Sequence, residues 1–513
     1  MKKLIVSVSL IITLLLVGCS SNKIKPVSSL YSSFATCYNI FPIAFADSNN
    51  DGKGDLRGII NQLDYLDDLG IDCIWLNPIH PSNTYHKYDV IDYYAIDPDF
   101  GTIDDFKDLV SEAKKRDIAI IIDFVINHTS SSHEWFKKSK VGDKQYRDYY
   151  RWRSKDDPNY TTLEGWVKAG DEYYFASFWD QMPELNYENK QVRKEIKKIA
   201  KYWLDLGVSG FRIDAAIHVY DPREYPKDTD VLGKGIDWFK EFNAYVKSVK
   251  KDAIIISEIW RDTSTVARFL PGMDSAFNFD LADAIVKGVK DRDATNIAKV
   301  LKTSRDMYAE ARSDYIDSIF LTNHDMNRVM STLNENTELA KLAAHVLFTL
   351  PGVVWVYYGE ELGMVGEKPD ENIREPFLWY EDHNKLPQTR WKTIEENTNT
   401  PSLEIQKNDP DSMYNTYKTL INLRKTNEAL YRGDYVHVPS KFFILSFIRE
   451  YKDEKLLVIH NFSKLDREIV VSGNLNSLLY SSHSENTYEG STIYMKSSST
   501  MIFKISENII ITN

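Results

Sequence analysis

Three carboxylates each follow an apolar, strand-like run of the sequence. Asp214 ends the segment Gly-Phe-Arg-Ile-Asp, Glu258 ends Ile-Ile-Ile-Ser-Glu, and Asp325 ends Phe-Leu-Thr-Asn-His-Asp. An acid in that position is poorly placed for a core and well placed for a site. In a parallel α/β barrel, the C-terminal ends of the strands converge on one face, which carries the chemistry. Several carboxylates on such a face suit glycoside hydrolysis, which needs a nucleophile and a proton donor.

Arg212 precedes Asp214 by two residues, so both side chains point to the same face of a strand. A neighbouring guanidinium favours the ionised carboxylate, and we therefore expect it to keep the pKa of Asp214 low. Partial burial near another acid would raise the pKa of Glu258 and let it protonate a leaving oxygen. The structural alternatives are an ion pair at a strand end for Arg212 and Asp214, and a structural acid for Glu258.

Two histidines occur in similar positions. His128 ends a fourth run, Asp123–His128, and His324 directly precedes Asp325. The imidazole of His324 could hydrogen-bond sugar hydroxyls, and Asp325 could hold adjacent hydroxyls while the sugar ring distorts. A histidine with its hydrogen bonds satisfied in the core is the alternative interpretation of His128.

Apolar runs alternate with amphipathic segments between about residues 35 and 430, which predicts an α/β fold with a (β/α)8 TIM barrel. We assign the barrel to residues 31–430. Residues 128–186 are aromatic, charged and irregular, and we expect an inserted domain there, after the third strand. Residues 431–513 show short alternating runs, which indicate a C-terminal antiparallel β-sandwich. The eight predicted strands are residues 35–45, 71–78, 118–125, 207–214, 253–259, 275–280, 318–323 and 352–358.

Composition excludes some functions. The formal net charge is −12, and the sequence contains no basic stripe, so we expect no nucleic-acid partner. The 31 tyrosines and 11 tryptophans could supply rings that stack on the flat faces of sugars. We expect a monomer.

The N-terminus is typical of an exported protein. Lys2 and Lys3 precede an apolar stretch, residues 4–17, which is short for a membrane span. The stretch leads into Leu-Val-Gly-Cys, which resembles a bacterial lipobox and makes Cys19 the lipidated residue. We therefore assign residues 1–18 to a signal peptide and residues 19–30 to a tether, and expect an extracytoplasmic protein anchored by acyl chains. A plain signal peptide with a chance cysteine is the alternative.

The remaining cysteines are Cys37 and Cys73. Each lies in an apolar, strand-like run, so we expect buried free thiols. The two runs would be neighbouring strands of the barrel, and a disulfide is the alternative that the sequence leaves open.

Oxygen side chains at alternate positions between residues 47 and 55 have the spacing of a calcium loop. The glutamate that ends an EF-hand loop is replaced by Gly58, so we predict a Ca²⁺ site without an EF-hand. A polar turn is the alternative, and a chelator should lower Tm if the metal binds. The predicted ligands are Asp47, Asn49, Asp51, the carbonyl of Lys53, and Asp55.

Together the four motifs resemble the α-amylase family of retaining glycoside hydrolases, over roughly residues 30–505. By resemblance, Asp214 is the nucleophile, Glu258 the general acid/base and Asp325 the transition-state stabiliser. The resemblance also implies two carboxyl groups roughly 5–5.5 Å apart. The motifs are residues 123–128, 210–218, 258–260 and 320–325. The residues that the resemblance places around the distorted sugar are Tyr88, His128, Arg212, His324 and Arg374.

Two further segments bear on specificity by the same resemblance. Residues 182–186, Met-Pro-Glu-Leu-Asn, are intermediate between oligo-1,6-glucosidases and neopullulanases. Position 85 is Tyr, where exo-acting α-glucosidases commonly have an Asp that grips the chain end, and this favours endo action. Asn127 and the carbonyl of His218 match the interdomain calcium of amylases, and whether this second ion is kept stays open.

The sequence thus predicts a lipid-anchored endo-α-amylase that cleaves internal α-1,4 bonds of starch-like glucans by double displacement. One alternative is an oligo-1,6-glucosidase, a neopullulanase-like enzyme or a transglycosylase. An alternative from another class is a non-catalytic glycan-binding lipoprotein that keeps the fold.

Overall fold

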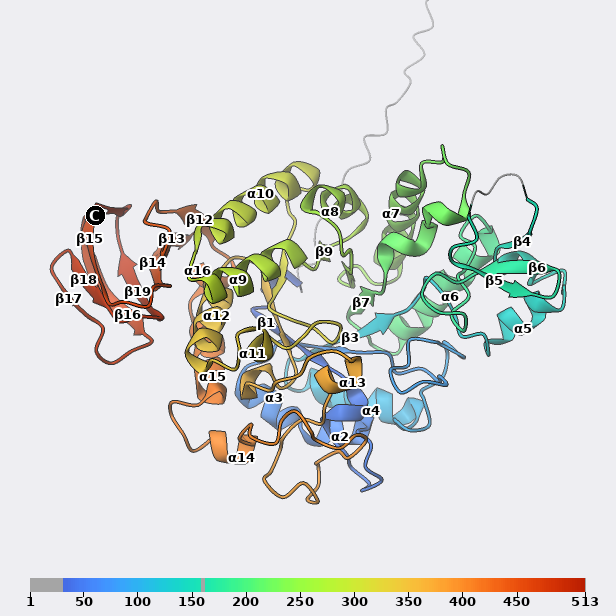
Figure 1. Ribbon diagram of the computed structural model, residues 1–513, viewed down its shortest axis with the longest axis horizontal. Coiled ribbons are helices and arrows are strands. Elements are labelled where there is room, and N and C mark those ends of the chain that lie inside the picture. The colour runs from blue at the N-terminus through green and yellow to red at the C-terminus, as the bar shows by residue number, and fades with distance from the viewer. Residues whose placement is uncertain (1–30, 158–161, 513) are drawn as a thin grey trace, which may run out of the picture.

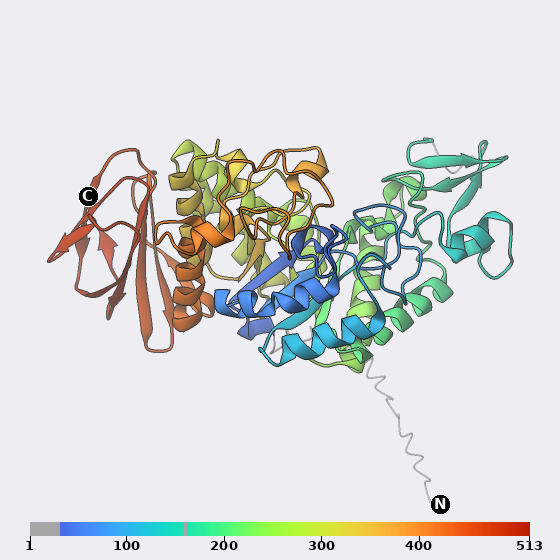
Figure 2. The ribbon, with the colours of Figure 1, turned by 90° about the horizontal axis from the view of Figure 1, so that it is seen from below.

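The computed structural model describes residues 31–157 and 162–512 (Figure 1). A barrel occupies the centre, a small sheet lies at one end, and the C-terminal sheets lie at the other end. Figure 2 shows the same order of the three parts from a second direction. The predicted signal peptide, tether and lipidated Cys19 lie outside the described residues.

The barrel is one eight-stranded parallel sheet with the order β10-β11-β1-β2-β3-β7-β8-β9. A parallel bridge between Phe277 and Ser318 joins its two edges and closes it. Every barrel strand lies within one of the eight predicted runs, so the predicted (β/α)8 fold is confirmed. The strands are β1 (Thr36–Ile40), β2 (Cys73–Leu76), β3 (Ala119–Phe124), β7 (Gly210–Ile213), β8 (Ile254–Ser257), β9 (Ser275–Ala276), β10 (Ser318–Phe320) and β11 (Val353–Tyr357).

Helices cover the outside of the barrel, and several begin at the caps that their sequences encode. Helix α4 begins after Thr102, which forms a capping box with Asp105, and Asn189 caps α6. The α-helices are α1 (Pro42–Phe45), α2 (Leu56–Asn61), α3 (Leu63–Leu69), α4 (Ile103–Lys114), α5 (Glu134–Lys140), α6 (Lys190–Asp205), α7 (Val231–Val249), α8 (Thr263–Phe269), α9 (Phe279–Asp291), α10 (Thr295–Ala311), α11 (Val329–Thr332), α12 (Thr337–Thr349), α13 (Asp370–Ile373), α14 (Leu403–Gln406), α15 (Met413–Thr426) and α16 (Glu428–Tyr431).

The region between β3 and α6 contains helix α5 and an antiparallel sheet with the order β4-β6-β5. Aromatic rings form its small core: Phe136 stacks on Trp152, and Tyr174 packs edge-on against Phe136. The strands are β4 (Trp152–Ser154), β5 (Trp166–Ala169) and β6 (Glu172–Phe175).

The C-terminal region forms two antiparallel sheets, β12-β13-β14-β19-β16 and β17-β18-β15-β20. Apolar side chains from both sheets share a separate core cluster that includes Leu457, Ile469 and Phe503. The short alternating runs predicted at residues 442–448, 455–460, 468–471 and 500–505 overlap β13, β14, β15 and β19. The strands are β12 (Asp434–His437), β13 (Ile444–Tyr451), β14 (Glu454–Asn461), β15 (Arg467–Ser472), β16 (Leu475–Ser481), β17 (Thr487–Glu489), β18 (Thr492–Met495), β19 (Ser499–Ile505) and β20 (Ile510–Ile511).

Two expectations are corrected. Cys37 and Cys73 form a disulfide and are not free thiols. They are direct partners in the register of β1 and β2, with their Cα atoms 4.6 Å apart, which is within disulfide reach. The first predicted strand is also too long, because Pro42 has no N–H for the ladder and α1 replaces its second half.

Within residues 31–157 and 162–512, we find no helix with both the length and the apolar character needed to cross a membrane.

Candidate active site

A hollow of about 640 Å³, the central hollow, opens at the C-terminal ends of the barrel strands. Arg212 and His324 are fully buried beneath this surface. Arg212 contacts the lining residue Asp214, and His324 contacts the lining residue Asp325. The fold therefore brings all eight predicted catalytic and substrate-binding residues to the central hollow, although only six of them line its surface. Those six are Tyr88, His128, Asp214, Glu258, Asp325 and Arg374.

Arg212 is the centre of the charge network. Its Nη1 lies 2.7 Å from Asp214 Oδ1 and 2.8 Å from Asp123 Oδ1, and its Nη2 lies 2.8 Å from Glu258 Oε2. The guanidinium also lies over the ring of Trp75, 4.9 Å from its centroid. One planar cation thus holds three carboxylates in fixed positions, which a flexible ammonium could not do.

Asp123 was missed as a functional residue by the sequence reasoning. It is buried on β3, and its direct register partner on β7 is Arg212. Its position at the start of the Asp123–His128 run was visible, but its partner depends on the pairing of two strands far apart in sequence.

Burial dominates the pKa values of this network. It raises the pKa of Asp214 and of Glu258, although the charge of Arg212 opposes the rise in both cases. The charge of Asp214 raises the pKa of Glu258 further. Burial also raises the pKa of Asp123 to about 7. The expectation of a low pKa for Asp214 is therefore wrong, because desolvation outweighs the lowering of that pKa by Arg212.

Asp325 has the opposite balance. Burial alone would raise its pKa, but His324 and Arg374 together hold that pKa well below its usual range. Its Oδ1 accepts a hydrogen bond from Arg374 Nη2 at 2.9 Å, and its Oδ2 lies 3.0 Å from His324 Nε2. Asp325 is therefore an ionised carboxylate on the wall of the hollow.

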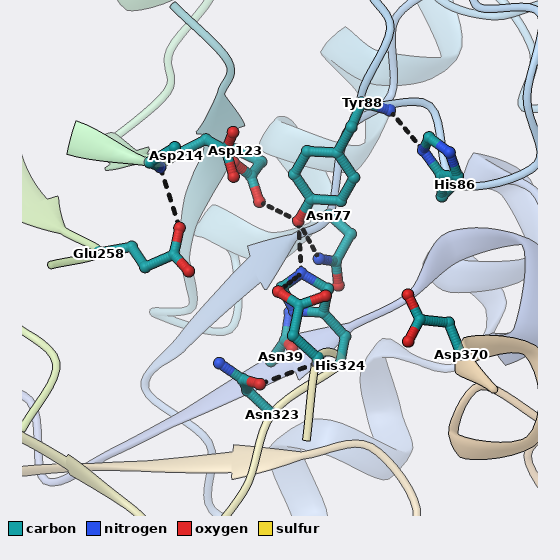
Figure 3. Close-up of polar contacts among 12 residues, drawn as sticks. Asn39, Asn77, His86, Tyr88, Asp123, Asp214, Glu258, Asn323, His324 and Asp370 are labelled. Carbon is teal, nitrogen blue, oxygen red and sulfur yellow. Dashed lines mark hydrogen bonds and ion pairs between the residues drawn. The ribbon is translucent and has the colours of Figure 1, made fainter. Parts of the chain in front are cut away.

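Figure 3 shows the hydroxyl of Tyr88 between Asp123 and His324. Its hydroxyl lies 3.0 Å from Asp123 Oδ2 and 2.6 Å from His324 Nε2, and it accepts a hydrogen bond from Asn77 at 3.0 Å. Its ring stacks parallel to the ring of His324, with centroids 5.6 Å apart. Tyr88 therefore ties the Arg212 network to Asp325 through fixed hydrogen bonds.

The model of the alpha-amylase catalytic domain family matches residues 39–433, and the model of the alpha-amylase SusG C-terminal domain matches residues 444–502. The chain belongs to the alpha-amylase family. It is 40% identical to alpha-amylase 3 of Dictyoglomus thermophilum, with 92% of this chain and 93% of that protein covered. This protein is thus an alpha-amylase family glycoside hydrolase.

Two further comparisons agree with this assignment. The oligo-1,6-glucosidase of Parageobacillus thermoglucosidasius is 32% identical, with coverage of 84% of this chain and 90% of that one. The crystal structure of the alpha-amylase from H. orenii superposes with a TM-score of 0.85 and 37% identity, covering 92% of this chain and 99% of that one. Family members with different names therefore resemble this hydrolase over most of its length.

The backbone after β7 positions the two acids of this family enzyme. Ala215 adopts a left-handed conformation with φ of 45°, directly after Asp214. In this conformation, the N–H of Ala215 donates to Glu258 Oε2 at 2.9 Å. A non-glycine residue in this region costs about 1–3 kcal/mol, and such strain clusters at functional sites. The turn thus fixes Glu258 relative to Asp214.

His128 is buried next to Tyr88. Its Nε2 lies 3.1 Å from the carbonyl oxygen of Tyr88, and burial lowers its pKa to about 4. The imidazole is therefore neutral at physiological pH, and its Nε2 carries the proton donated to that carbonyl.

The predicted calcium loop, residues 47–55, connects α1 and α2. Both carboxylate oxygens of Asp47 accept backbone N–H groups of the loop, and those of Asp55 accept groups of Ser48 and Gly58. Carboxylate, amide and carbonyl oxygens are the hard ligands that a calcium ion prefers. A bound ion would compete with these backbone N–H groups for the carboxylate oxygens of Asp47 and Asp55. Across the part of the chain that the structure describes, no group of three or more His, Cys, Asp or Glu side chains is arranged to hold a metal.

Proposed function

We propose that this hydrolase is an endo-acting α-amylase that cleaves α-1,4-glucosidic bonds of starch-like glucans by double displacement. The observation that carries the proposal is the Arg212 network, in which one guanidinium holds Asp214 and Glu258 at the same wall of the hollow. Glycoside hydrolysis with retention requires two carboxyl groups held at a fixed separation of roughly 5–5.5 Å.

In the first step, Asp214 attacks the anomeric carbon while Glu258 donates its proton to the departing glycosidic oxygen. Arg212 favours the ionised form of Asp214, and the charge of Asp214 favours the protonated form of Glu258. The products are a covalent glycosyl ester on Asp214 and a glucan with a new hydroxyl group.

In the second step, Glu258 removes a proton from water, and the water oxygen attacks the anomeric carbon and releases Asp214. The hydrogen bond from Ala215 N–H holds Glu258 in place for both proton transfers. Asp325, held ionised by His324 and Arg374, would bind hydroxyls of the distorted sugar and stabilise the positive charge that develops on the ring.

Endo action is supported by the shape beyond the central hollow. A second, open hollow shares His86 and Asp370 with the central one and continues past Tyr85. The ring of Tyr85 stacks on Trp391, and its hydroxyl accepts a hydrogen bond from Arg374 at 3.0 Å. A chain could therefore extend past this point, and no carboxylate at position 85 grips a chain end.

The test is the size of the earliest products from amylose, with the Asp214→Asn variant as the blank. A spread of long and medium oligosaccharides is expected, and the blank should release none. Glucose as the sole early product would refute endo action and the argument from Tyr85.

The second candidate function is cleavage of α-1,6 bonds, with or without transfer to another sugar. The similarity to an oligo-1,6-glucosidase and the motif at residues 182–186 favour it. Rates on pullulan, isomaltose and amylose at equal bond concentration separate the two candidates. A non-catalytic glycan-binding protein would bind amylose and leave every one of these substrates intact.

We also propose that residues 47–55 bind Ca²⁺. The alternating oxygen donors support it, namely Asp47, Asn49, Asp51, the Lys53 carbonyl and Asp55. We expect that EDTA lowers Tm and that added calcium restores it. The Asp51→Asn variant should need more calcium for the same recovery. Equal Tm values with and without EDTA would contradict the site.

The lipobox-like segment supports a further proposal, that Cys19 carries acyl chains and anchors the enzyme outside the cytoplasm. Labelling of cells with a radioactive fatty acid should mark the wild-type protein, and the Cys19→Ala variant should be released unlabelled. Labelling of both proteins would place the lipid elsewhere.

A further inference from the structure

Two buried asparagines lie behind Tyr88 and have no part in the reaction steps described above. Asn39 belongs to β1, and Asn77 directly follows β2. Their side chains are 2% and 1% exposed, and neither lines the central hollow. Figure 3 shows Asn77 directed at the hydroxyl of Tyr88. Buried amides at the catalytic end of the barrel need their hydrogen bonds explained one by one.

A backbone carbonyl fixes the orientation of the first amide. Asn39 Nδ2 donates to the carbonyl oxygen of Trp75 at 3.2 Å, and that oxygen can only accept. The same Nδ2 donates to Asn77 Oδ1 at 2.9 Å. The other group of Asn77, its Nδ2, therefore faces Tyr88 and donates to the hydroxyl oxygen at 3.0 Å. The peptide group of Trp75 thus determines the direction of the hydrogen bonds as far as Tyr88.

The two other neighbours of the Tyr88 hydroxyl complete its hydrogen bonds. His324 Nε2 lies 3.0 Å from Asp325 Oδ2, and its Nδ1 has no hydrogen-bond partner among residues 31–157 and 162–512. The imidazole therefore carries its proton on Nε2 and donates toward Asp325 and toward the Tyr88 oxygen, which lies 2.6 Å away. Since the Tyr88 oxygen also accepts from Asn77, both of its lone pairs are occupied. Its own proton is donated to Asp123 Oδ2 at 3.0 Å.

The orientation of Asn39 has a cost, which argues against a purely structural role. Its Oδ1 is buried and lacks a donor within the part of the chain that the structure describes. A buried acceptor without a donor destabilises the fold, whereas two apolar side chains of the same shape as Asn39 and Asn77 would avoid that cost. Such costs at buried positions are expected beside functional sites. The effect of the two amides on Tyr88 supplies the function.

We propose that Asn77, together with the asparagine behind it, is a positioning residue for the reaction. Its hydrogen bond occupies one lone pair of Tyr88 and directs the tyrosine proton to Asp123. His324 then remains a donor toward Asp325, the carboxylate that would stabilise the transition state. The inference rests on the proposed double displacement, because it names what holds Tyr88 and His324 in the geometry that this reaction uses.

A double-mutant cycle on the full-length enzyme tests the proposal. Asn77→Ala should lower kcat on amylose about fivefold and leave KM within twofold, because the groups that line the central hollow remain. In the Tyr88→Phe background the same change should alter kcat less than twofold, since the hydroxyl that Asn77 positions is absent. Equal losses in both backgrounds would mean that Asn77 only fills space. An unchanged kcat in Asn77→Ala would also overturn the proposal.

The matched control is Asn461→Ala in the C-terminal region. Asn461 is fully buried, and its Nδ2 donates to two backbone carbonyls. This variant should lower Tm and leave kcat within twofold. An equal loss of kcat in Asn461→Ala would assign the effect of Asn77→Ala to general destabilisation.

The role of Asn39 is tested through Asn77. Asn39→Ala should lower kcat about threefold in the wild-type background, because the Asn77 amide is then free to turn. It should change kcat less than twofold in the Asn77→Ala background. Independent losses from the two changes would contradict a single chain of hydrogen bonds that ends at Tyr88.

Urea unfolding of the four proteins of the first cycle separates this proposal from the proposed function. The losses of unfolding free energy in Asn77→Ala and Tyr88→Phe should not add, because both changes remove the same hydrogen bond. Coupled unfolding in a wild type that leaves amylose intact would support the hydrogen bonds and refute the proposed function. Cleavage of amylose without coupling in kcat or in unfolding would support the proposed function and overturn the role of Asn77.

Discussion

Two groups of carboxylates follow strands of the same barrel, and they differ in what balances their charge. Asp214 and Glu258 follow β7 and β8 and share the guanidinium of Arg212. Glu360 and Glu361 follow β11, and tyrosine hydroxyls bind them. Asp214, Glu360 and Glu361 are buried and Glu258 is partly buried, and all four lie beyond the ends of apolar strands.

The tyrosine-bound pair is part of the core. Tyr417 donates to Glu360 at 3.0 Å, and Tyr65 donates to Glu361 at 2.6 Å. Burial raises the pKa of Glu360 to about 8 and also raises the pKa of Glu361. A neutral acid that accepts hydrogen bonds from hydroxyl groups is stable in a core. A cation beside several carboxylates instead favours their ionised forms. An acid at the end of a strand therefore marks a site only when a cation and open space accompany it.

The largest effect is expected for Asp214→Asn. The amide cannot attack the anomeric carbon, so release of reducing ends from amylose should fall by about 10⁴-fold or more. Asp370→Asn, which changes another acid in the lining of the central hollow, should cost far less. Equal losses in both variants would mean that the lining as a whole, and not Asp214, carries the reaction.

Arg212→Lys should have the next largest effect. Lysine cannot hold Asp214 and Glu258 together, so kcat/KM should fall about 10²-fold. Loss of the guanidinium also raises the carboxyl pKa values further, which moves the acid limb of the pH–activity profile to higher pH.

The matched control for Arg212→Lys is Arg424→Lys, because Arg424 is equally buried but donates to backbone carbonyls. The control should lower Tm and leave the position of the pH profile unchanged. A shift of the acid limb in both variants would show that general destabilisation causes it.

The same Tyr→Phe change, made once beside each group of carboxylates, compares the Arg212-bound group with the tyrosine-bound group directly. Tyr88→Phe removes the hydroxyl next to Asp123 and His324, so kcat should fall about tenfold. Tyr417→Phe removes the hydroxyl that binds Glu360 and should cost about 1 kcal/mol of unfolding free energy, with activity within twofold. Activity and urea unfolding measure the two outcomes, and a tenfold loss of activity in Tyr417→Phe would contradict the assignment.

The smallest effect on activity is expected for Glu360→Gln. The folded protein holds the pKa of Glu360 at about 8, above its ordinary value of 4.5, so the native state binds more protons than the unfolded state between these pH values. Stability contributed by this group is complete below pH 4.5 and is lost as pH rises toward 8.

Urea unfolding between pH 5 and about 8 measures this loss, and Glu360→Gln should flatten it. The exposed Glu404→Gln variant is the control and should keep the slope. An unchanged slope in Glu360→Gln would assign the pH dependence to other buried acids.

Much of the candidate site could be predicted because its spacing is local. The two-residue separation of Arg212 and Asp214 predicts that both point to one face, and the Nη1–Oδ1 distance of 2.7 Å agrees. The disulfide between Cys37 and Cys73 and the pairing of Asp123 with Arg212 could not be predicted. Both depend on the register between strands that are distant in sequence.

By itself, the sequence determined the barrel, the family and the positions of the acids, because apolar periodicity and short motifs encode them. Only the tertiary structure decided which acids meet a cation, which meet tyrosines, and which reach the central hollow. It also set the direction of the Asp214 pKa, since burial outweighs Arg212 there. The physical reason is that charge and desolvation depend on neighbours that the fold brings together from many segments of the chain.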